Sequence, residues 1–457
     1  MFQPFFSFLS SLRDIGEEGY ETLLKKPLFL LGDQGAKVRE MFLGMPRKQA
    51  VTIYAGVLWV IPIAMVQPYT SLYMVSLGLS ETEVGVYQNL MKIVGVVCLF
   101  LGGYLSDAWS RKKTLILFDA LSWGGYCFSL ALADSKWWCV SAIVFLATNA
   151  GAGVPYQCLL GEGVAAKKQT YVYTVLQMVN LAPFLFFFPL LGGLWVSKMG
   201  LGPANHAMYW FFTVMVTVGI FLRWKYLPET VEGENRDTSW NYLFTISWFH
   251  VFRDGFRQFR EELGKFFKKP GSRFFFSSKF LDEWMIYIWG IYSSLYMVHY
   301  LGMKESYLSI LTQGSAYVAF LTLFLIIPTI TESQMVKLLG ADQVFAFGSL
   351  TVLIFLSPGS DNVLIVCLLS ACLGAVGGAL FGSVSAAVWM SLIEEKQRAK
   401  VVAAFYALAQ VGIAVTGNGG AYLYGKVSPL SLLWVMIGMR VVSFVLLRRV
   451  ARVLQSS

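Results

Sequence analysis

Long apolar runs separated by short polar segments recur along the chain from about residue 50 onward. An α-helix needs about 20 apolar residues to cross a hydrocarbon layer of about 30 Å. The pattern therefore predicts an all-α membrane protein with twelve spanning helices, at about residues 50–77, 82–106, 112–133, 136–161, 170–197, 206–227, 276–299, 306–329, 341–358, 362–389, 400–424 and 429–447.

Composition supports this interpretation and excludes other classes. The chain is 56% hydrophobic and 14% charged, whereas about a quarter of the residues of a soluble domain are charged. The net charge of +9 would suggest nucleic acid in a soluble protein, but here the basic residues flank apolar runs, so we expect a lipid bilayer and no nucleic acid as partner.

No sequence pattern indicates a cofactor, a metal site or an enzyme. The six cysteines lie in apolar runs without metal-binding spacing, and the three histidines are isolated from one another. There is no nucleotide-binding loop and no nucleophile elbow. Residues 1–12 lack the basic region and the cleavage site of a signal peptide, so none is expected.

The distribution of Lys and Arg predicts the orientation. If residue 1 is cytoplasmic, the inward segments carry 30 basic residues, with the central loop counted from Arg223 to Lys279, and the outward loops carry 4. Positive charge concentrates on the cytoplasmic side of membrane proteins. We therefore predict a multi-pass protein of the plasma membrane with both termini in the cytoplasm.

The chain divides into two six-span halves that resemble each other. The segment from Ser71 to Gly78, SLYMVSLG, returns as SLYMVHYLG between Ser294 and Gly302, an offset close to half the chain. Parallel repeats of this kind are typical of alternating-access transporters. The predicted organisation is an interfacial N-terminal segment (1–49), a first bundle (50–227), a cytoplasmic amphipathic linker (228–275), a second bundle (276–447) and a cytoplasmic tail (448–457).

A motif after the second span carries a family resemblance. The stretch 102–113, GGYLSDAWSRKK, resembles the loop signature of the major facilitator superfamily, Gly-x-Leu-x-Asp followed by a basic run. Ala108 and Ser110 depart from the usual pattern. The positions that match it are Gly103, Leu105, Asp107, Arg111 and Lys112.

The resemblance implies a conformational latch. In the family this cluster holds the two halves together in the outward-facing state, with an acidic residue at the end of the fourth span, where Glu162 stands in this chain. The segment 189–193, PLLGG, is similar to the end of a pattern found in family antiporters, with Phe188 in place of its first glycine. This second resemblance favours export.

Charged residues inside the spans are candidates for proton or substrate binding, because an unpaired charge in hydrocarbon costs several kcal/mol. A carboxylate in a low-dielectric cavity can exchange protons in the working pH range. Asp119, Asp282 and Glu283 are therefore proton-site candidates, and Lys92 is a substrate candidate. Structural alternatives remain open: Asp119 can pair with a basic group near Arg111, and Lys92 with a carboxylate.

Two further groups of span residues bear on the cavity. Arg440 is the weakest candidate, since the last span lies at the periphery in the family and its long side chain can snorkel. Polar residues that can line a cavity, or instead bond neighbouring helices, are Gln88, Asn89, Gln157, Gln177, Asn180, Gln313, Gln410 and Asn418.

These features predict a secondary transporter that moves a small organic solute by alternating access, with proton-coupled efflux as the first hypothesis. The family's usual form is a monomer. One alternative is an uncoupled facilitator or an uptake permease for an organic anion or a sugar, which Lys92 would suit. A second alternative is a transceptor or scramblase-like protein that uses the same fold to bind without net transport.

Overall fold

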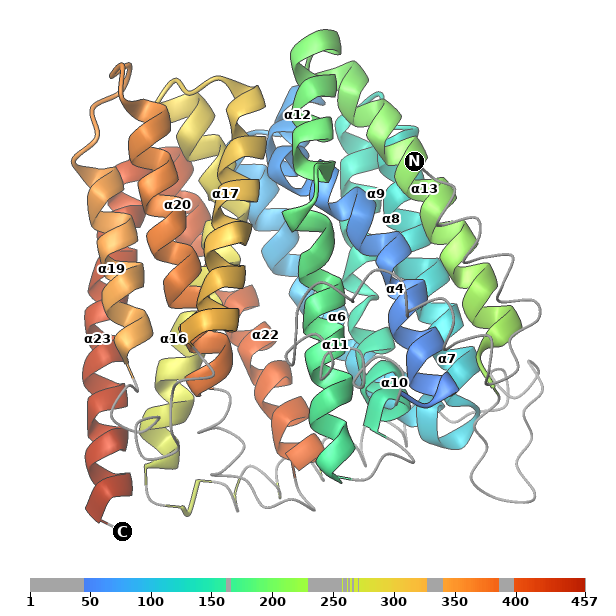
Figure 1. The fold of residues 1–457 in the computed structure, drawn as a ribbon. Coiled ribbons are helices and arrows are strands. Elements are labelled where there is room, and N and C mark those ends of the chain that lie inside the picture. The colour runs from blue at the N-terminus through green and yellow to red at the C-terminus, as the bar shows by residue number, and fades with distance from the viewer. Residues whose placement is uncertain are drawn as a thin grey trace.

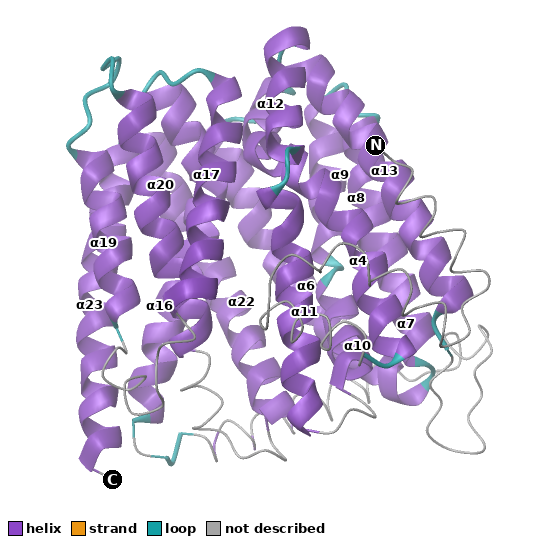
Figure 2. Cartoon of the chain, in the orientation of Figure 1, coloured by secondary structure: helices purple, strands orange, loops and turns teal. Residues whose placement is uncertain are grey.

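The computed structural model describes residues 45–161, 166–228, 257, 261, 264, 267–269, 271–326, 340–385 and 398–456. Every regular element in this part of the chain is helical (Figure 2). Helices satisfy all their backbone groups internally, which a lipid environment requires. The first group of elements is α4 (Arg47–Val66), η1 (Gln67–Tyr69), α5 (Thr70–Ser76), α6 (Glu81–Ala108), α7 (Arg111–Asp119), η2 (Ala120–Gly124), α8 (Gly125–Ala131), α9 (Lys136–Ala147), α10 (Ala150–Gly161), α11 (Ala166–Leu185), α12 (Phe188–Met199) and α13 (Leu201–Tyr226).

The second group follows the central segment and stands beside the first (Figure 1). Contacts between α16 and α23, between α17 and α20, and between α19 and both α20 and α23 hold it together. Its elements are α16 (Ser272–Leu295), η3 (Tyr296–Tyr300), η4 (Glu305–Tyr307), α17 (Leu308–Leu321), η5 (Thr322–Ile326), α19 (Ala341–Ile354), α20 (Val363–Leu380), η7 (Phe381–Ser385), α22 (Arg398–Tyr422), η9 (Leu423–Val427) and α23 (Pro429–Ser456).

Nine helical stretches of the described residues are long and apolar enough to cross a membrane. Three predicted spans are not among these nine, and they correspond to α16, α19 and α22. α19 is apolar but has 14 residues, and α16 carries four charged side chains within its 24 residues. The prediction of twelve spans therefore stays a prediction for these three.

The repeated sequence has matching local structure in the two groups. The hydroxyl of Tyr73 donates to the carbonyl oxygen of Leu130, and that of Tyr296 donates to the carbonyl oxygen of Leu353, each over 3.2 Å and across 57 residues. Both repeats end at a glycine with a positive φ, +99° at Gly78 and +75° at Gly302, which few other residues adopt. The chain thus makes the same turn after α5 and after η3.

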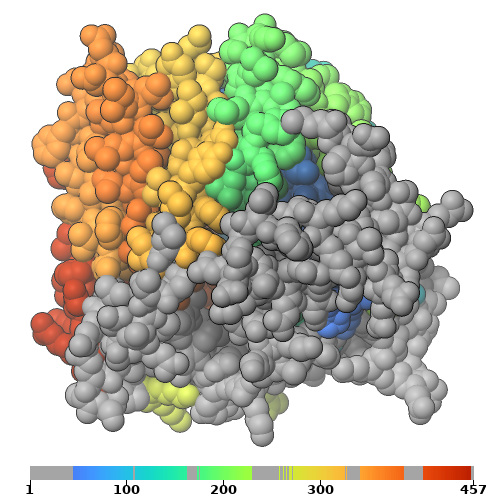
Figure 3. Space-filling model, viewed as in Figure 1, coloured from blue at the N-terminus to red at the C-terminus, as the bar shows by residue number. Residues whose placement is uncertain are grey.

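The two groups meet closely at one end of the molecule. Figure 3 shows the green surface of α12 against the yellow surface of α17 at the upper end. Behind them, α6 packs along α22 and touches η9. Glu81, at the start of α6, lies 2.6 Å from Nδ1 of His299 in η3. This pair links the two groups at that end.

Candidate functional site

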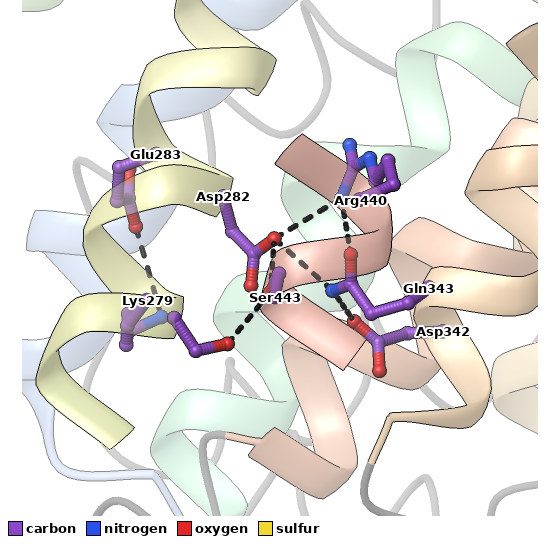
Figure 4. Close-up of polar contacts among 8 residues, drawn as sticks. Lys279, Asp282, Glu283, Asp342, Gln343, Arg440 and Ser443 are labelled. Atoms are coloured by element: carbon purple, nitrogen blue, oxygen red, sulfur yellow. Dashed lines mark hydrogen bonds and ion pairs between the residues drawn. The ribbon is translucent and has the colours of Figure 1, made fainter. Parts of the chain in front are cut away.

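The charged residues predicted in the seventh and twelfth spans lie together in the second group (Figure 4). An amino group of the Arg440 guanidinium donates to Oδ1 of Asp282 over 3.2 Å and to Oε1 of Gln343 over 3.1 Å. The last span lies at the outer edge of the bundle (Figure 1), but the expectation that the Arg440 side chain snorkels is wrong, because it points inward and is 12% exposed. A buried acid on the neighbouring α16 provides the reason.

The side chain of Gln343 links two buried acids. The side-chain amide of Gln343 donates to Asp282 over 3.0 Å and to Asp342 over 2.6 Å. Ser443 of α23 donates to Asp282 as well, over 3.2 Å. We call Asp282, Asp342, Gln343 and Arg440 the acid–arginine cluster. Its formal charge is −1 when both acids are ionised, since two carboxylates face one guanidinium.

The acid–arginine cluster is buried but not fully bonded. Asp282 is 1% exposed and Asp342 is 5% exposed. Among the described residues, neither Oδ2 of Asp282 nor Nε of Arg440 has a hydrogen-bond partner. A buried polar atom without a partner costs about 1–3 kcal/mol.

A cavity of about 710 Å³ opens beside the cluster. Asp342 and Arg440 line it, together with hydroxyl groups such as Ser349 and Ser370 and aromatic side chains such as Trp289. Gln67 and Leu181 close it from the first group of helices. Its volume and its mostly apolar wall with few polar groups are those of a small-molecule site.

Glu283 and Lys92 belong to a second charged region, at the boundary between the two groups, and each has a different partner. Glu283 lies 3.7 Å from Nζ of Lys279, one turn earlier on α16. The ammonium of Lys92, on α6, lies 3.9 Å from the centre of the Tyr287 ring on α16. Lys92 thus reaches from the first group to the second through a cation–π contact.

The structure places Asp119 away from this region. Its carboxylate pairs with the guanidinium of Arg223, on α13, which also donates to the carbonyl oxygen of Thr52 and stacks 4.3 Å from the Trp59 ring. Arg223 is buried, although the charge pattern assigned it to the cytoplasmic loop. Asp119 is therefore the packing partner of a basic group, as the structural alternative had it, and that group is Arg223.

Some of the polar residues that were predicted to line a cavity lie at the boundary between the two groups of helices, and others do not. Asn89 on α6 donates to Asn418 on α22 over 3.4 Å, and Gln410 faces α6 at Gly95. Gln313 donates to the carbonyl oxygen of Leu185 over 3.3 Å. The others do not meet at one place: Gln157 accepts from Tyr173, Gln88 is half-buried, and Gln177 and Asn180 are exposed.

The motif stretch packs tightly where it is described. Ser110 accepts a hydrogen bond from the backbone of Lys113 and so caps α7, which places Arg111 and Lys112 in its first turn. Gly103 faces Val154 at ordinary contact distance. Glu162 and the side chain of Asp107 lie outside the described residues, so the latch stays a prediction.

Sequence reasoning missed Asp342, Gln343 and Arg223. Asp342 stands at the edge of a predicted span, where an acid attracts no notice, and Arg223 was grouped with loop charges. The repeat could have found Asp342, because the offset that relates Ser71 to Ser294 also relates Asp119 to Asp342. Gln343 carries no signal beyond its position next to this acid.

Two groups of membrane-spanning helices with a cavity between them are typical of membrane transporters. The family model of the Major Facilitator Superfamily matches residues 50–310. The chain therefore belongs to the Major Facilitator Superfamily, as the motif indicated. No curated protein matches the sequence.

Solved structures of transporters have the same fold. The human organic anion transporter MFSD10 (TETRAN) superposes with a TM-score of 0.60 at 14% identity, covering 88% of this chain and 100% of that one. The nucleoside transporter NupG gives 0.60 at 14% identity, with 89% and 99% covered. A POT family transporter in complex with 5-aminolevulinic acid gives 0.65 at 13% identity, with 88% and 95% covered.

Proposed function

We propose that the protein is a secondary transporter that exports a small organic solute by alternating access in exchange for protons. The proposed architecture is twelve spans in two parallel six-helix repeats with cytoplasmic termini, acting as a monomer in the plasma membrane. The observation that carries the proposal is the acid–arginine cluster, because it places an incompletely bonded carboxylate, Asp282, next to a cavity in a transporter fold.

Asp282 is the proposed proton site among the three predicted acids. Asp119 is matched one-to-one by Arg223, and Glu283 is paired with Lys279. Asp282 instead bonds a guanidinium that is linked through Gln343 to a second acid, and one of its oxygens has no partner in the described part of the chain. Protonation of Asp282 would remove the excess negative charge of the cluster.

A different observation favours the alternative of an anion or sugar uptake permease. Lys92 projects from the first group into the boundary with the second, where the acid that acts on it, Glu283, already pairs with Lys279. The ammonium of Lys92 has no carboxylate within ion-pair distance among the described residues. An anionic solute would neutralise it.

Proton flux in liposomes tests the proposal. Purified protein is reconstituted with a pH-sensitive dye inside, and candidate solutes are added outside. Proton-coupled exchange predicts a change of internal pH that needs the solute and is lost in Asp282→Asn but kept in Asp361→Asn, which removes a charge from an exposed loop. Solute uptake without a pH change, abolished by Lys92→Ala, would instead establish the permease.

A further inference from the structure

Each group of helices contains a buried arginine with acidic side chains near it, but the number of acids per arginine differs between the two groups. The repeat that aligns Tyr73 with Tyr296 also aligns Asp119 with Asp342, and Trp59 with Asp282. In the first group an arginine stacks on Trp59 and pairs with Asp119. In the second group, the residue corresponding to that tryptophan is an acid.

This replacement changes the charge balance. Arg223 and Asp119 form a neutral pair. Arg440 bonds Asp282 directly and reaches Asp342 only through Gln343. Asp342 is therefore left with a neutral amide as its described side-chain partner, and it lines the cavity while Asp282 does not.

The surroundings of Asp342 favour a cationic occupant. It lies in the first turn of α19, where the helix dipole stabilises an ionised carboxylate. One amino group of the Arg440 guanidinium is bonded to Asp282 and Gln343, so Asp342 is the cavity-lining carboxylate without an ion pair of its own among the described residues. The cavity wall adds the indole of Trp289 and apolar side chains such as Met285 and Phe184, which suit the body of an amphipathic amine.

We propose that this cavity binds an organic cation with an amine group on Asp342, and that protonation of Asp282 expels it. With both acids ionised, the cluster carries −1 and a bound ammonium makes it neutral. With Asp282 protonated, the cluster is neutral and a bound ammonium would leave a net charge of +1 in a low-dielectric site. Proton and amine therefore oppose each other, as linkage between two sites requires for exchange.

The other charged groups near the two acids do not alter the change in net charge that protonation of Asp282 causes. Lys279 and Glu283 on α16 form a pair that is neutral in both states. Lys92 lies over Tyr287 outside the cavity lining. α20, which packs on α19, carries no Asp, Glu, Lys, Arg or His.

This inference rests on the proposed transport function, but equilibrium binding tests it without any gradient. The probes are 2-phenylethylamine, the neutral 2-phenylethanol and the anionic 3-phenylpropanoate, titrated calorimetrically into the full-length protein in detergent. The amine alone should bind. Asp342→Asn should weaken its affinity at least tenfold, whereas the matched control Asp361→Asn should leave it within threefold. Preferential binding of the anion, or amine binding that survives Asp342→Asn, would overturn the proposal.

A charge-balance pair of variants tests the role of Asp282. Asp282→Asn mimics the protonated state and should also weaken amine binding at least tenfold, although Asp342 is intact. Adding Arg440→Gln returns the cluster to −1 and should restore the affinity to within threefold of the original protein. A double variant that has a cooperative unfolding transition but does not bind the amine would refute the charge argument.

If these variants do not fold, the original protein gives the same comparison through pH. Amine affinity should fall as the pH is lowered, and binding should release protons, which is measured in two buffers of different ionisation enthalpy. Affinity that is independent of pH would overturn the coupling. Amine binding without proton flux in liposomes would refute the exchange function but support the binding site. Proton flux with another solute and no amine binding would refute the binding site but support the exchange function.

Discussion

The contact between α6 and α10 allows a sharp prediction, because two adjacent glycines differ completely in their surroundings. A Cβ at Gly102 would lie 2.0 Å from the carbonyl oxygen of Gly151, whereas a Cβ at Gly103 would lie 3.9 Å from Val154. Ordinary contact needs about 3.5 Å. Gly102→Ala must therefore push α10 away by about 1.5 Å, since the atom in its way belongs to the backbone and cannot rotate aside.

The magnitude follows from opposing effects. Overpacking costs typically 1–3 kcal/mol, and against a backbone atom we take the upper end, about 3 kcal/mol. Alanine in place of glycine returns up to about 1 kcal/mol through helix propensity. Gly102→Ala should thus destabilise the protein by about 2 kcal/mol, a factor of about 30 in the ratio of folded to unfolded protein, while Gly103→Ala should be neutral or stabilising.

Unfolding in sodium dodecyl sulfate, followed by tryptophan fluorescence, measures both variants under the same conditions. The transition of Gly102→Ala should come at a clearly lower detergent fraction than that of Gly103→Ala. Equal midpoints for the two variants would refute the close approach of α6 and α10.

Two further contacts give predictions of their own. Arg223→Met leaves the buried carboxylate of Asp119 unpaired and should lower the free energy of unfolding by about 3–5 kcal/mol. Adding Asp119→Asn should recover most of this loss in the same unfolding assay. If the double variant shows no recovery, the broken ion pair is not the cause of the loss. Glu81→Gln weakens the contact with His299, a partly exposed pair that contributes about 1 kcal/mol or less. Spin-label distances should then show up to about fivefold more molecules in which α6 and η3 are separated. Because the imidazolium forms at low pH, closure in the original protein should weaken as the pH rises, with Glu305 as the other acid near the histidine; the same pH profile in Glu81→Gln would exclude this pair as the cause.

The sequence predicted the helical class and the family because these depend on local signals. Apolar run length is a property of each segment alone, and the motif at 102–113 is contiguous. The matching turns at Gly78 and Gly302 follow from the repeated segment in the same way.

The site could be predicted only in part, because its contacts join residues far apart in the chain. Asp282 was identified from its charge inside a span, but its partner Arg440 lies 158 residues later. The pattern of apolar residues does not show which face of α23 packs against α16. The sequence alone therefore cannot distinguish an arginine that snorkels from one that is buried. Asp342 was missed for a related reason: its burial depends on how α19 packs against α23.

The boundary between α6 and the second group bears on the proposed alternating-access mechanism. Glycines on one side face polar atoms on the other: a Cβ at Gly95 would meet Gln410, one at Gly417 would meet Asn89, and one at Gly425 would meet Thr82.

Within each group, by contrast, large side chains such as Phe212 and Tyr296 are completely buried. Small residues allow close approach of helices. Separating α6 from α22 would expose polar groups that water can bond, so the proposed alternating-access mechanism predicts movement at the boundary between the groups rather than within either group.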